Sequence, residues 1–217
     1  TNNYAERESM HKIKLQQMSG AGVNSLADSF DRLPETDHKD GKYRLRRYSR
    51  IRLSKDDCFR YETLEPKPFN QSKQYNDFQG GVDRLFEDLE EDVVQSCGMR
   101  EMCYSFLESS GFSEHHEIEI HQMRVITKNR LAQVSPEGVH QDGYKHIAII
   151  GIKRYNISGG HVLVYKEKDS HPIVDFALDD GEMIMLDDRE LWHNATDIHA
   201  LERSSQGYMD AFILTAG

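Results

Sequence analysis

Three residues in the second half of the chain have side chains that bind transition metals. His140 and Asp142 form a His-x-Asp pair within PEGVHQDG (136–143), and His193 lies in LWHN (191–194). In an extended chain, residues two positions apart point to the same side, so both side chains of the pair can reach one ion. The segment between Asp142 and His193 is long enough to form several strands, which can return His193 to a position opposite the pair.

This donor set has more than one chemical interpretation. Two imidazoles and one carboxylate on one face leave positions open on the ion, an arrangement that suits non-haem iron(II) oxygenases. The same set can hold zinc, so a cupin-like isomerase or hydrolase is an alternative. A third interpretation is that His140 and His193 are ordinary sheet histidines, because His-x-Asp is common by chance. Gly143, Gly159-Gly160 and Asp187-Asp188 around the two segments favour the metal site.

Short strands are the elements that must position these residues. Residues 117–127 alternate, with Ile118 and Ile120 on one side and Met123 and Val125 on the other. Turn residues separate the further strand candidates, and short strands punctuated in this way predict a β-sandwich or barrel. We therefore expect a jelly roll over 111–217, built from 117–127, 146–152, 161–165, 173–178, 182–186, 191–196 and 208–215.

The first half of the chain has a different pattern. Residues 1–40 are polar with loosely spaced apolar positions, which predicts one or two helices, and the apolar spacing from Gly80 to about Ser110 is also helical. Between them, residues 43–53 alternate and are rich in arginine, which predicts a strand. We expect an α+β fold and one domain over 1–217, with 1–110 mainly helical around the Arg-rich strand and 111–217 forming the jelly-roll core.

Composition limits the partners. The 217-residue chain has a net charge of −10 and a pI of about 5.5, which disfavours nucleic acid and anionic membranes. No run approaches the roughly 18 apolar residues of a membrane span. The three cysteines, Cys58, Cys97 and Cys103, suggest no disulfide framework, so we expect a cytoplasmic protein. The first forty residues are expected to pack on the barrel or on a second subunit, which leaves a homodimer open.

Several separate motifs, in the same order, resemble those of the bacterial iron(II)/2-oxoglutarate dioxygenases that hydroxylate free aliphatic amino acids, the isoleucine dioxygenase group. The resemblance runs from about Tyr43 to the C-terminus. It implies a double-stranded β-helix, iron ligands at His140, Asp142 and His193, 2-oxoglutarate and dioxygen as cosubstrates, and a small amino acid as substrate. The matching segments are RLRRYSR (44–50), FNQSKQYN (69–76) with Gly80-Gly81, HQMR (121–124), PEGVHQDG (136–143), SGG (158–160) and WHNAT (192–196).

One position departs from the family pattern. The family has an Arg-Asp pair at the start of the last strand, where the arginine grips the distal carboxylate of 2-oxoglutarate, but here the pair is Met209-Asp210. Methionine cannot make that charge-assisted contact. Another cation could replace it, with Arg203 and Arg124 as candidates, although the first could be a solvated loop charge and the second a structural ion pair. Alternatively, the site accepts a different oxo acid, or the protein is a binding module with a relict site.

The Arg-rich strand is the candidate for substrate recognition. Alternation places Arg44 and Arg46, Tyr48 and Arg50 on one side of it, and a buried arginine there would suit a free carboxylate. We expect Arg46, Tyr48 and Arg50 to contact substrate, together with Tyr75 from the 69–76 motif. The alternatives are an exposed cationic strand, and a tyrosine that only packs.

Overall fold

A seven-stranded sheet forms the centre of the protein. The structure, a computed structural model, describes residues 12–54, 60–70, 81, 84–111 and 116–217. The strand order of this sheet is β1-β9-β5-β12-β4-β2-β3, and neighbouring strands are antiparallel. Its strands are β1 (Ile13–Gln17), β2 (Arg44–Ser54), β3 (Arg60–Thr63), β4 (His116–Thr127), β5 (His146–Tyr155), β9 (Glu182–Leu186) and β12 (Gly207–Ala216).

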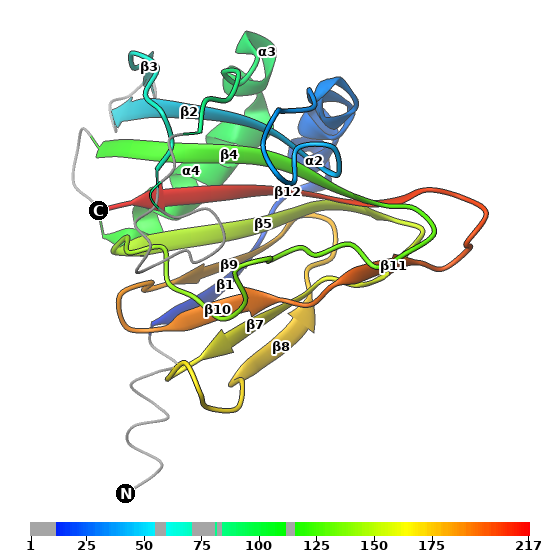
Figure 1. The fold of residues 1–217 in the computed structure, drawn as a ribbon. Coiled ribbons are helices and arrows are strands. Elements are labelled where there is room, and N and C mark those ends of the chain that lie inside the picture. Colours follow the sequence, from blue (N-terminus) through cyan, green and yellow to red (C-terminus); the bar gives the residue numbers. More distant parts are fainter. Residues whose placement is uncertain (1–11, 55–59, 71–80, 82–83, 112–115) are drawn as a thin grey trace, which may run out of the picture.

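Shorter strands form a second layer on one face of this sheet (Figure 1). They are β10 (Trp192–Ala195), β7 (His161–Tyr165) and β8 (Val174–Ala177) in one sheet, and β11 (Ile198–Ala200) with β6 (Ile157–Gly159) in a ribbon. Apolar residues from both layers, including Ile147, Val164 and Ile184, form the core between them. Two facing antiparallel sheets with helices outside confirm the expected α+β, double-stranded β-helix fold.

Helices cover the opposite face of the large sheet. They are α2 (Gly20–Ala27), the 3-10 helix η1 (Asp28–Arg32), α3 (Glu91–Val94) and α4 (Cys97–Ser110). The side chain of Ser96 caps the start of α4 by accepting the N–H of Met99, and Gly111 ends it with a φ of 67°. Buried Phe106 packs into a core that includes Ile118 of β4. No helix in the described part of the chain is long and apolar enough to span a membrane.

Two of the expected elements are different in the structure. Residues 13–17 form strand β1, paired with β9, where helix was expected, because pairing at the sheet edge overrides a weak local pattern. The helix expected from Gly80 begins at Glu91, and Arg84 instead forms an isolated β-bridge with Phe69. The first half of the chain therefore contributes strands β1, β2 and β3 to the large sheet.

The alternation of β4 shows what each face of the large sheet contacts. Ile118 and Ile120 face the helices, whereas Met123 and Val125 belong to a cluster on the other side, with Ile198 of β11. The second side is the one that faces the short strands and the cavity described below.

Candidate metal centre

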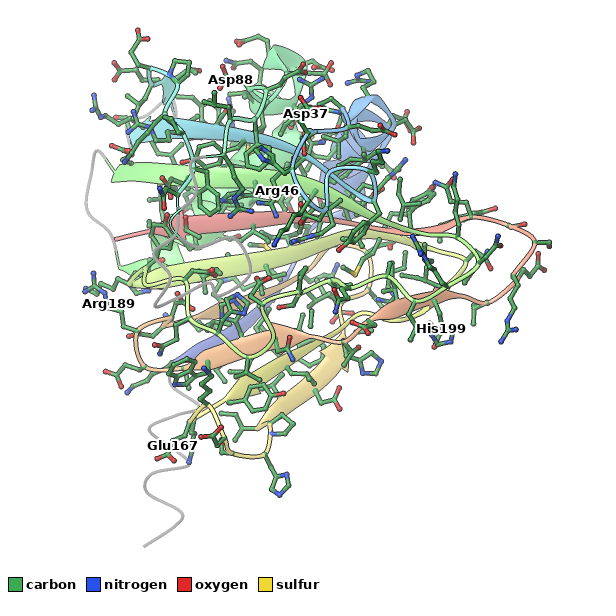
Figure 2. All side chains as sticks on the ribbon, in the orientation of Figure 1. Asp37, Arg46, Asp88, Glu167, Arg189 and His199 are labelled. Atoms are coloured by element: carbon green, nitrogen blue, oxygen red, sulfur yellow. The ribbon has the colours of Figure 1, made fainter. Side chains whose placement is uncertain are left out.

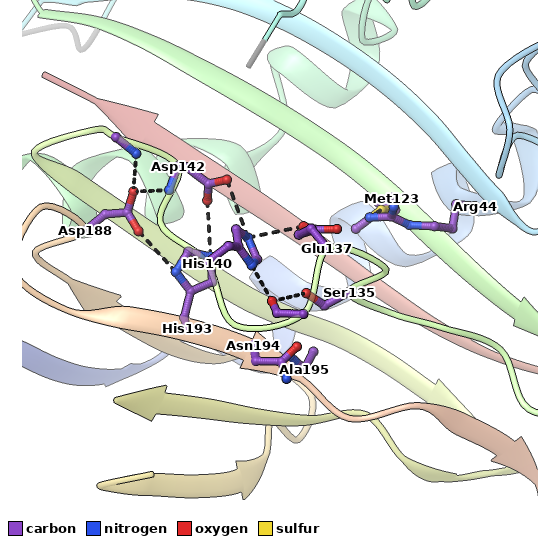
Figure 3. A network of polar contacts seen from close by, with 12 residues as sticks. Arg44, Met123, Ser135, Glu137, His140, Asp142, Asp188, His193, Asn194 and Ala195 are labelled. Atoms are coloured by element: carbon purple, nitrogen blue, oxygen red, sulfur yellow. Dashed lines mark hydrogen bonds and ion pairs between the residues drawn. The ribbon is translucent and has the colours of Figure 1, made fainter. Parts of the chain in front are cut away.

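The segment that carries His140 lies between β4 and β5 and is held against β10. The backbone N–H of His140 donates to the carbonyl of His193 at 2.9 Å, and the N–H of His193 donates back to the carbonyl of His140 at 2.9 Å. This bridge brings the centroids of the two imidazole rings to 4.2 Å (Figure 3). Backbone pairing between distant segments therefore assembles the site.

The ligand atoms of His140, Asp142 and His193 converge, as the sequence predicted. One nitrogen or oxygen atom from each residue lies within 4.8 Å of the others. Asp142 Oδ1 is 3.5 Å from His140 Nε2, and Asp142 Oδ2 is 3.1 Å from His193 Nε2. Both histidines are buried, so the three groups share one small, protected space.

Residues behind the rings orient the two imidazoles. The Nδ1–H of His140 donates to the carbonyl of Gly138 at 2.7 Å, and Gly138 adopts a φ of 72°, which favours glycine. Nδ1 of His193 lies 3.1 Å from Asp188 Oδ1. With Nδ1 engaged, each ring presents Nε2 to the shared space, the arrangement found in metal-binding histidines.

Asp188 also holds the Asp142 loop in place. Its Oδ2 accepts the backbone N–H groups of Asp142 at 2.7 Å and Gly143 at 2.8 Å, and its side chain is fully buried. The sequence analysis did not select this residue, although it noted the Asp187-Asp188 pair before His193. One carboxylate therefore connects the two segments that supply the ligands.

The charges within the triad fit a divalent cation. Burial alone would raise the pKa of Asp142, but its contacts with His140 and His193 hold that pKa well below the usual range. Burial opposes protonation of His193, yet Asp142 and Asp188 outweigh it and raise its pKa to about 10. A site that attracts a proton this strongly attracts a metal cation for the same reason, and two imidazoles with one carboxylate suit iron(II).

A second carboxylate, Glu137, lies beside the triad, and the sequence analysis missed it. Its Oε1 is 3.1 Å from His140 Nε2. A nitrogen that coordinates a metal has no proton to share, so metal binding would release Glu137 to other partners in the cavity. Its place in PEGVHQDG, three residues before the first ligand, was the available signal.

The triad opens into a cavity that also contains arginines. Arg44, Arg46 and Arg84 line it together, and Arg44 is paired with Asp40 at 2.6 Å. Arg46 is 7% exposed and has no carboxylate at ion-pair distance among the described residues; its Nη2 lies 3.3 Å from Met123 Sδ. Burial, with Arg44 and Arg84 nearby, lowers the pKa of Arg46 to about 9. Figure 2 shows Arg46 in the interior of the molecule.

The other expected substrate residues are placed differently. The hydroxyl of Tyr48 donates to Glu119 at 2.6 Å, and its ring centroid lies 4.8 Å from that of His121, so Tyr48 packs against a cavity residue and does not line the cavity itself. Arg50 pairs with Glu117 at 3.0 Å and does not line the cavity. Tyr75 lies outside the described residues.

Neither expected replacement for the family's arginine reaches the cavity. Arg124 lies on the helix-facing side of β4, where it donates to Asp210 at 2.7 and 2.9 Å and to Asp31 at 2.9 Å. Arg203 is exposed in the turn before β12. Met209 itself does line the cavity.

His121 is a further cavity residue that the sequence did not single out. It is 5% exposed, and its ring packs 4.6 Å from Phe69. Burial and the nearby Arg46 and Arg84 lower its pKa well below the usual range, so it is neutral at physiological pH. A neutral imidazole offers the cavity one donor and one acceptor.

Comparison with solved structures shows the same fold in several proteins. A bsmA homolog from Methylobium petroleophilum PM1 is 21% identical, with a TM-score of 0.81 over 99% of this chain and 91% of that chain. IDO from Bacillus thuringiensis is 17% identical, with a TM-score of 0.78 over 100% and 98%. The Fe(II)/(alpha)ketoglutarate-dependent dioxygenase TqaL is 12% identical, with a TM-score of 0.71 over 99% and 85%. A search of curated proteins finds no match.

A family comparison covers most of the chain. The profile of the 2OG-Fe dioxygenases matches residues 27–215, a span that contains all three candidate ligands and the whole cavity. Enzymes of this family use iron(II), 2-oxoglutarate and dioxygen, and the His-Asp-His triad described above fits the iron. The chain therefore belongs to the 2OG-Fe dioxygenase family.

Proposed function

We propose that this dioxygenase hydroxylates an unactivated carbon of a free amino acid. The observation that carries the proposal is a pair of opposite charges on the cavity wall beside the triad, Arg46 and Glu137. Much of the remaining lining is aliphatic, including Ile147, Ile149 and Val162. A zwitterionic head group with an apolar side chain matches this distribution of charge.

Each charge of the pair has a chemical reason to bind substrate. Arg46 is buried without an acidic partner, and a guanidinium in that state favours a bidentate carboxylate. Burial and neighbouring arginines lower the pKa of both Arg46 and Arg84, and Glu137 is close enough for its charge to oppose part of that lowering. Once His140 holds a metal, the ammonium of an amino acid can take the place of its ring as the partner of Glu137.

Different residues of the chain have different roles in the proposed reaction. His140, Asp142 and His193 would hold iron(II), which together with 2-oxoglutarate and dioxygen supplies the oxidising chemistry of the family. Arg46 and Glu137 fix the head group, so the carbon to be oxidised is set by the distance from this anchor to the metal. The aliphatic lining excludes water from that carbon.

The motif resemblance to the isoleucine dioxygenase group favours the same substrate class. It includes PEGVHQDG, which carries Glu137 as well as two of the ligands, and RLRRYSR, which carries Arg46. The motifs that carry the resemblance therefore supply both members of the charge pair, and both support a free amino acid.

A screen of free amino acids tests this proposal. The protein is loaded with iron(II) and 2-oxoglutarate, and succinate release is measured with each amino acid against the rate without one. We expect at least one aliphatic amino acid to accelerate release and to take up oxygen from labelled dioxygen, as followed by mass spectrometry. Acceleration by peptides only, or by non-amino-acid compounds only, would exclude the proposed substrate class.

Substrate analogues identify the role of each charge. Arg46→Met is expected to raise KM for the amino acid by about 10–100-fold and to remove the preference for the acid over its methyl ester. Glu137→Gln is expected to remove the preference for the amino acid over its deaminated analogue. Arg52→Met is the matched control, because Arg52 lies on the same strand and pairs with Glu62 at the surface. Unchanged preferences in both variants would contradict the assignment.

A further inference from the structure

The cavity contains a fourth arginine, Arg154, which lies on a different strand from Arg44 and Arg46. Arg44 and Arg46 lie on β2 and Arg154 lies on β5, with β4 and β12 between them. Three strand spacings of about 4.8 Å place their backbones about 14 Å apart. The cavity therefore has two separate cationic regions, and the substrate proposed above uses only the one on β2.

A β-bulge turns Arg154 into the cavity. Ile147, Ile149 and Gly151 of β5 line it, and simple alternation would next point Lys153 inward. The register with β12 shifts between Asp210 and Ala211, so that Lys153 is opposite Asp210 and Arg154 is opposite Met209. Bulges re-aim side chains in this way, often beside active sites. As a result Arg154 lines the cavity and Lys153 is exposed.

Arg154 and Met209 converge on the same point. A Cβ atom placed on Gly160 would lie 2.9 Å from Met209 Sδ and 3.3 Å from Arg154 Nη1. Gly160 adopts a φ of 66°, so glycine is favoured there by its backbone and by the space that the two side chains need. The guanidinium of Arg154 thus occupies the space beside the side chain at position 209.

The guanidinium is held in place but is not fully bonded. Nη2 donates to the carbonyl of Gly159 at 2.6 Å. Nη1 is buried and has no hydrogen-bond partner among the described residues. A buried donor without a partner carries a free-energy cost that an anionic ligand would remove.

We propose that Arg154 binds the distal carboxylate of 2-oxoglutarate in this enzyme. The cosubstrate needs a metal at its oxo-acid end and a cation at its other end, and both line this cavity. Position 209, where the resembling family places an arginine, holds methionine, and Arg154 is its direct cross-strand neighbour. The cation of this chain thus lies on β5, the strand next to β12, which carries the arginine in the resembling family. This assignment rests on the cosubstrate of the family and is independent of the amino acid proposed above.

Anaerobic binding titrations test the assignment without turnover. The iron(II)-loaded protein is titrated with 2-oxoglutarate and with 2-oxopentanoate, which has the same carbon chain but no distal carboxylate, and the visible charge-transfer band is followed. We expect the wild type to prefer 2-oxoglutarate by about 10–100-fold and Arg154→Met to lose that preference while binding 2-oxopentanoate as before. Lys153→Met, the exposed neighbour, should retain the preference.

Two further variants separate binding from structure. Adding Met209→Arg to Arg154→Met is expected to restore the preference for 2-oxoglutarate, which no purely structural role of Arg154 would allow. If the methionine variant does not fold, Arg154→Gln carries the same test, since it removes the charge and keeps a donor for Gly159. The assignment fails if the wild type has no preference, if the variants keep it, or if Arg46→Met removes it instead. Because no amino acid is present, these outcomes do not depend on the substrate screen.

Discussion

The two faces of the large sheet both carry buried arginines, yet the arginines have different surroundings. On the helix-facing side, Arg124 satisfies both oxygens of Asp210 and reaches Asp31. On the cavity side, Arg44 has a carboxylate partner in Asp40, but Arg46 and the Nη1 atom of Arg154 have none at ion-pair distance among the described residues. Each partner of a matched buried pair compensates the burial of the other, so removing one is strongly destabilising, whereas an unmatched buried charge costs stability and is available to a ligand. The partner of each arginine, and not its burial, therefore indicates its role.

The largest effect on stability is expected on the helix-facing side of the large sheet, where the buried Arg124 has a carboxylate partner. Arg124→Met leaves Asp210 fully buried without its partner, which should lower the free energy of unfolding by about 3–5 kcal/mol. Urea denaturation measures the loss. A double variant, Arg124→Met with Asp210→Met, should recover most of it, because an apolar pair has no charge to bury. If Arg124→Met weakened 2-oxoglutarate binding and left stability intact, the structural assignment would be wrong.

The same variant should show a pH dependence of known sign. Burial already raises the pKa of Asp210 to about 6 against the opposing effect of Arg124, so removal of Arg124 should raise it further. A folded carboxyl with a raised pKa binds more protons than the unfolded one, and stability then falls as pH rises. The destabilisation by Arg124→Met should therefore be larger at pH 8 than at pH 5. An equal or opposite difference would contradict a buried carboxylate.

The next effect concerns the residue that connects the ligand segments. Asp188→Asn removes the charge beside His193 Nδ1 and weakens the support of the Asp142 loop. We expect the affinity for iron(II) to fall about 10–100-fold, as for other partners of metal ligands. Competition with a chelator under anaerobic conditions measures it. The neighbouring Asp187→Asn is the control, and an equal loss there would point to a general effect on the loop.

On the cavity side, replacing the arginine that has no carboxylate partner should stabilise the fold. Arg46→Met replaces a buried cation, whose pKa is lowered by burial and by two neighbouring arginines, with an apolar side chain of similar length. We expect a gain of about 1–3 kcal/mol, seen as a higher Tm at neutral pH, alongside the loss of substrate affinity. A lower Tm would mean that Arg46 has a stabilising partner, and the contrast between the two faces would fail.

The smallest effect is expected at the surface. The Arg52–Glu62 pair has side chains that are 45% and 64% exposed, so water and salt screen it. Arg52→Met should change the free energy of unfolding by less than about 1 kcal/mol in urea denaturation. A change as large as that of Arg124→Met would show that pairing alone, without burial, decides the energetics.

Much of the centre could be predicted from the chain because it depends on local geometry. Period-two alternation brings His140 and Asp142 to one side of the backbone. The strands between Asp142 and His193, separated by turns, allow the chain to return His193 to a position opposite that pair. The same alternation placed Arg46 on one side of β2 with Arg44 and Arg50, and the structure shows Arg44 and Arg46, but not Arg50, lining the cavity. Arg124 has the same parity on β4 as Ile118 and Ile120, and the structure shows that this side faces the helices and not the cavity.

Other features depended on which segments meet. Nothing in the alternation of β5 selects Arg154, because the bulge that turns it inward exists only in the pairing with β12. Arg84 and Phe69 face the cavity through an isolated bridge between two irregular segments. Strand β1 forms at the sheet edge because β9 offers it unpaired backbone groups.

The sequence by itself determined the chemical types at the centre, the alternation of its strands and the family to which its motifs point. The tertiary structure alone decided which charges are neutralised. A carboxylate such as Asp210 or Asp188 reaches its partner only through strand register and loop placement, and these are set by contacts between residues far apart in the chain. A direct ion pair forms only when the two charged groups lie within a few ångströms of each other, so the role of each arginine here follows from its neighbours in space.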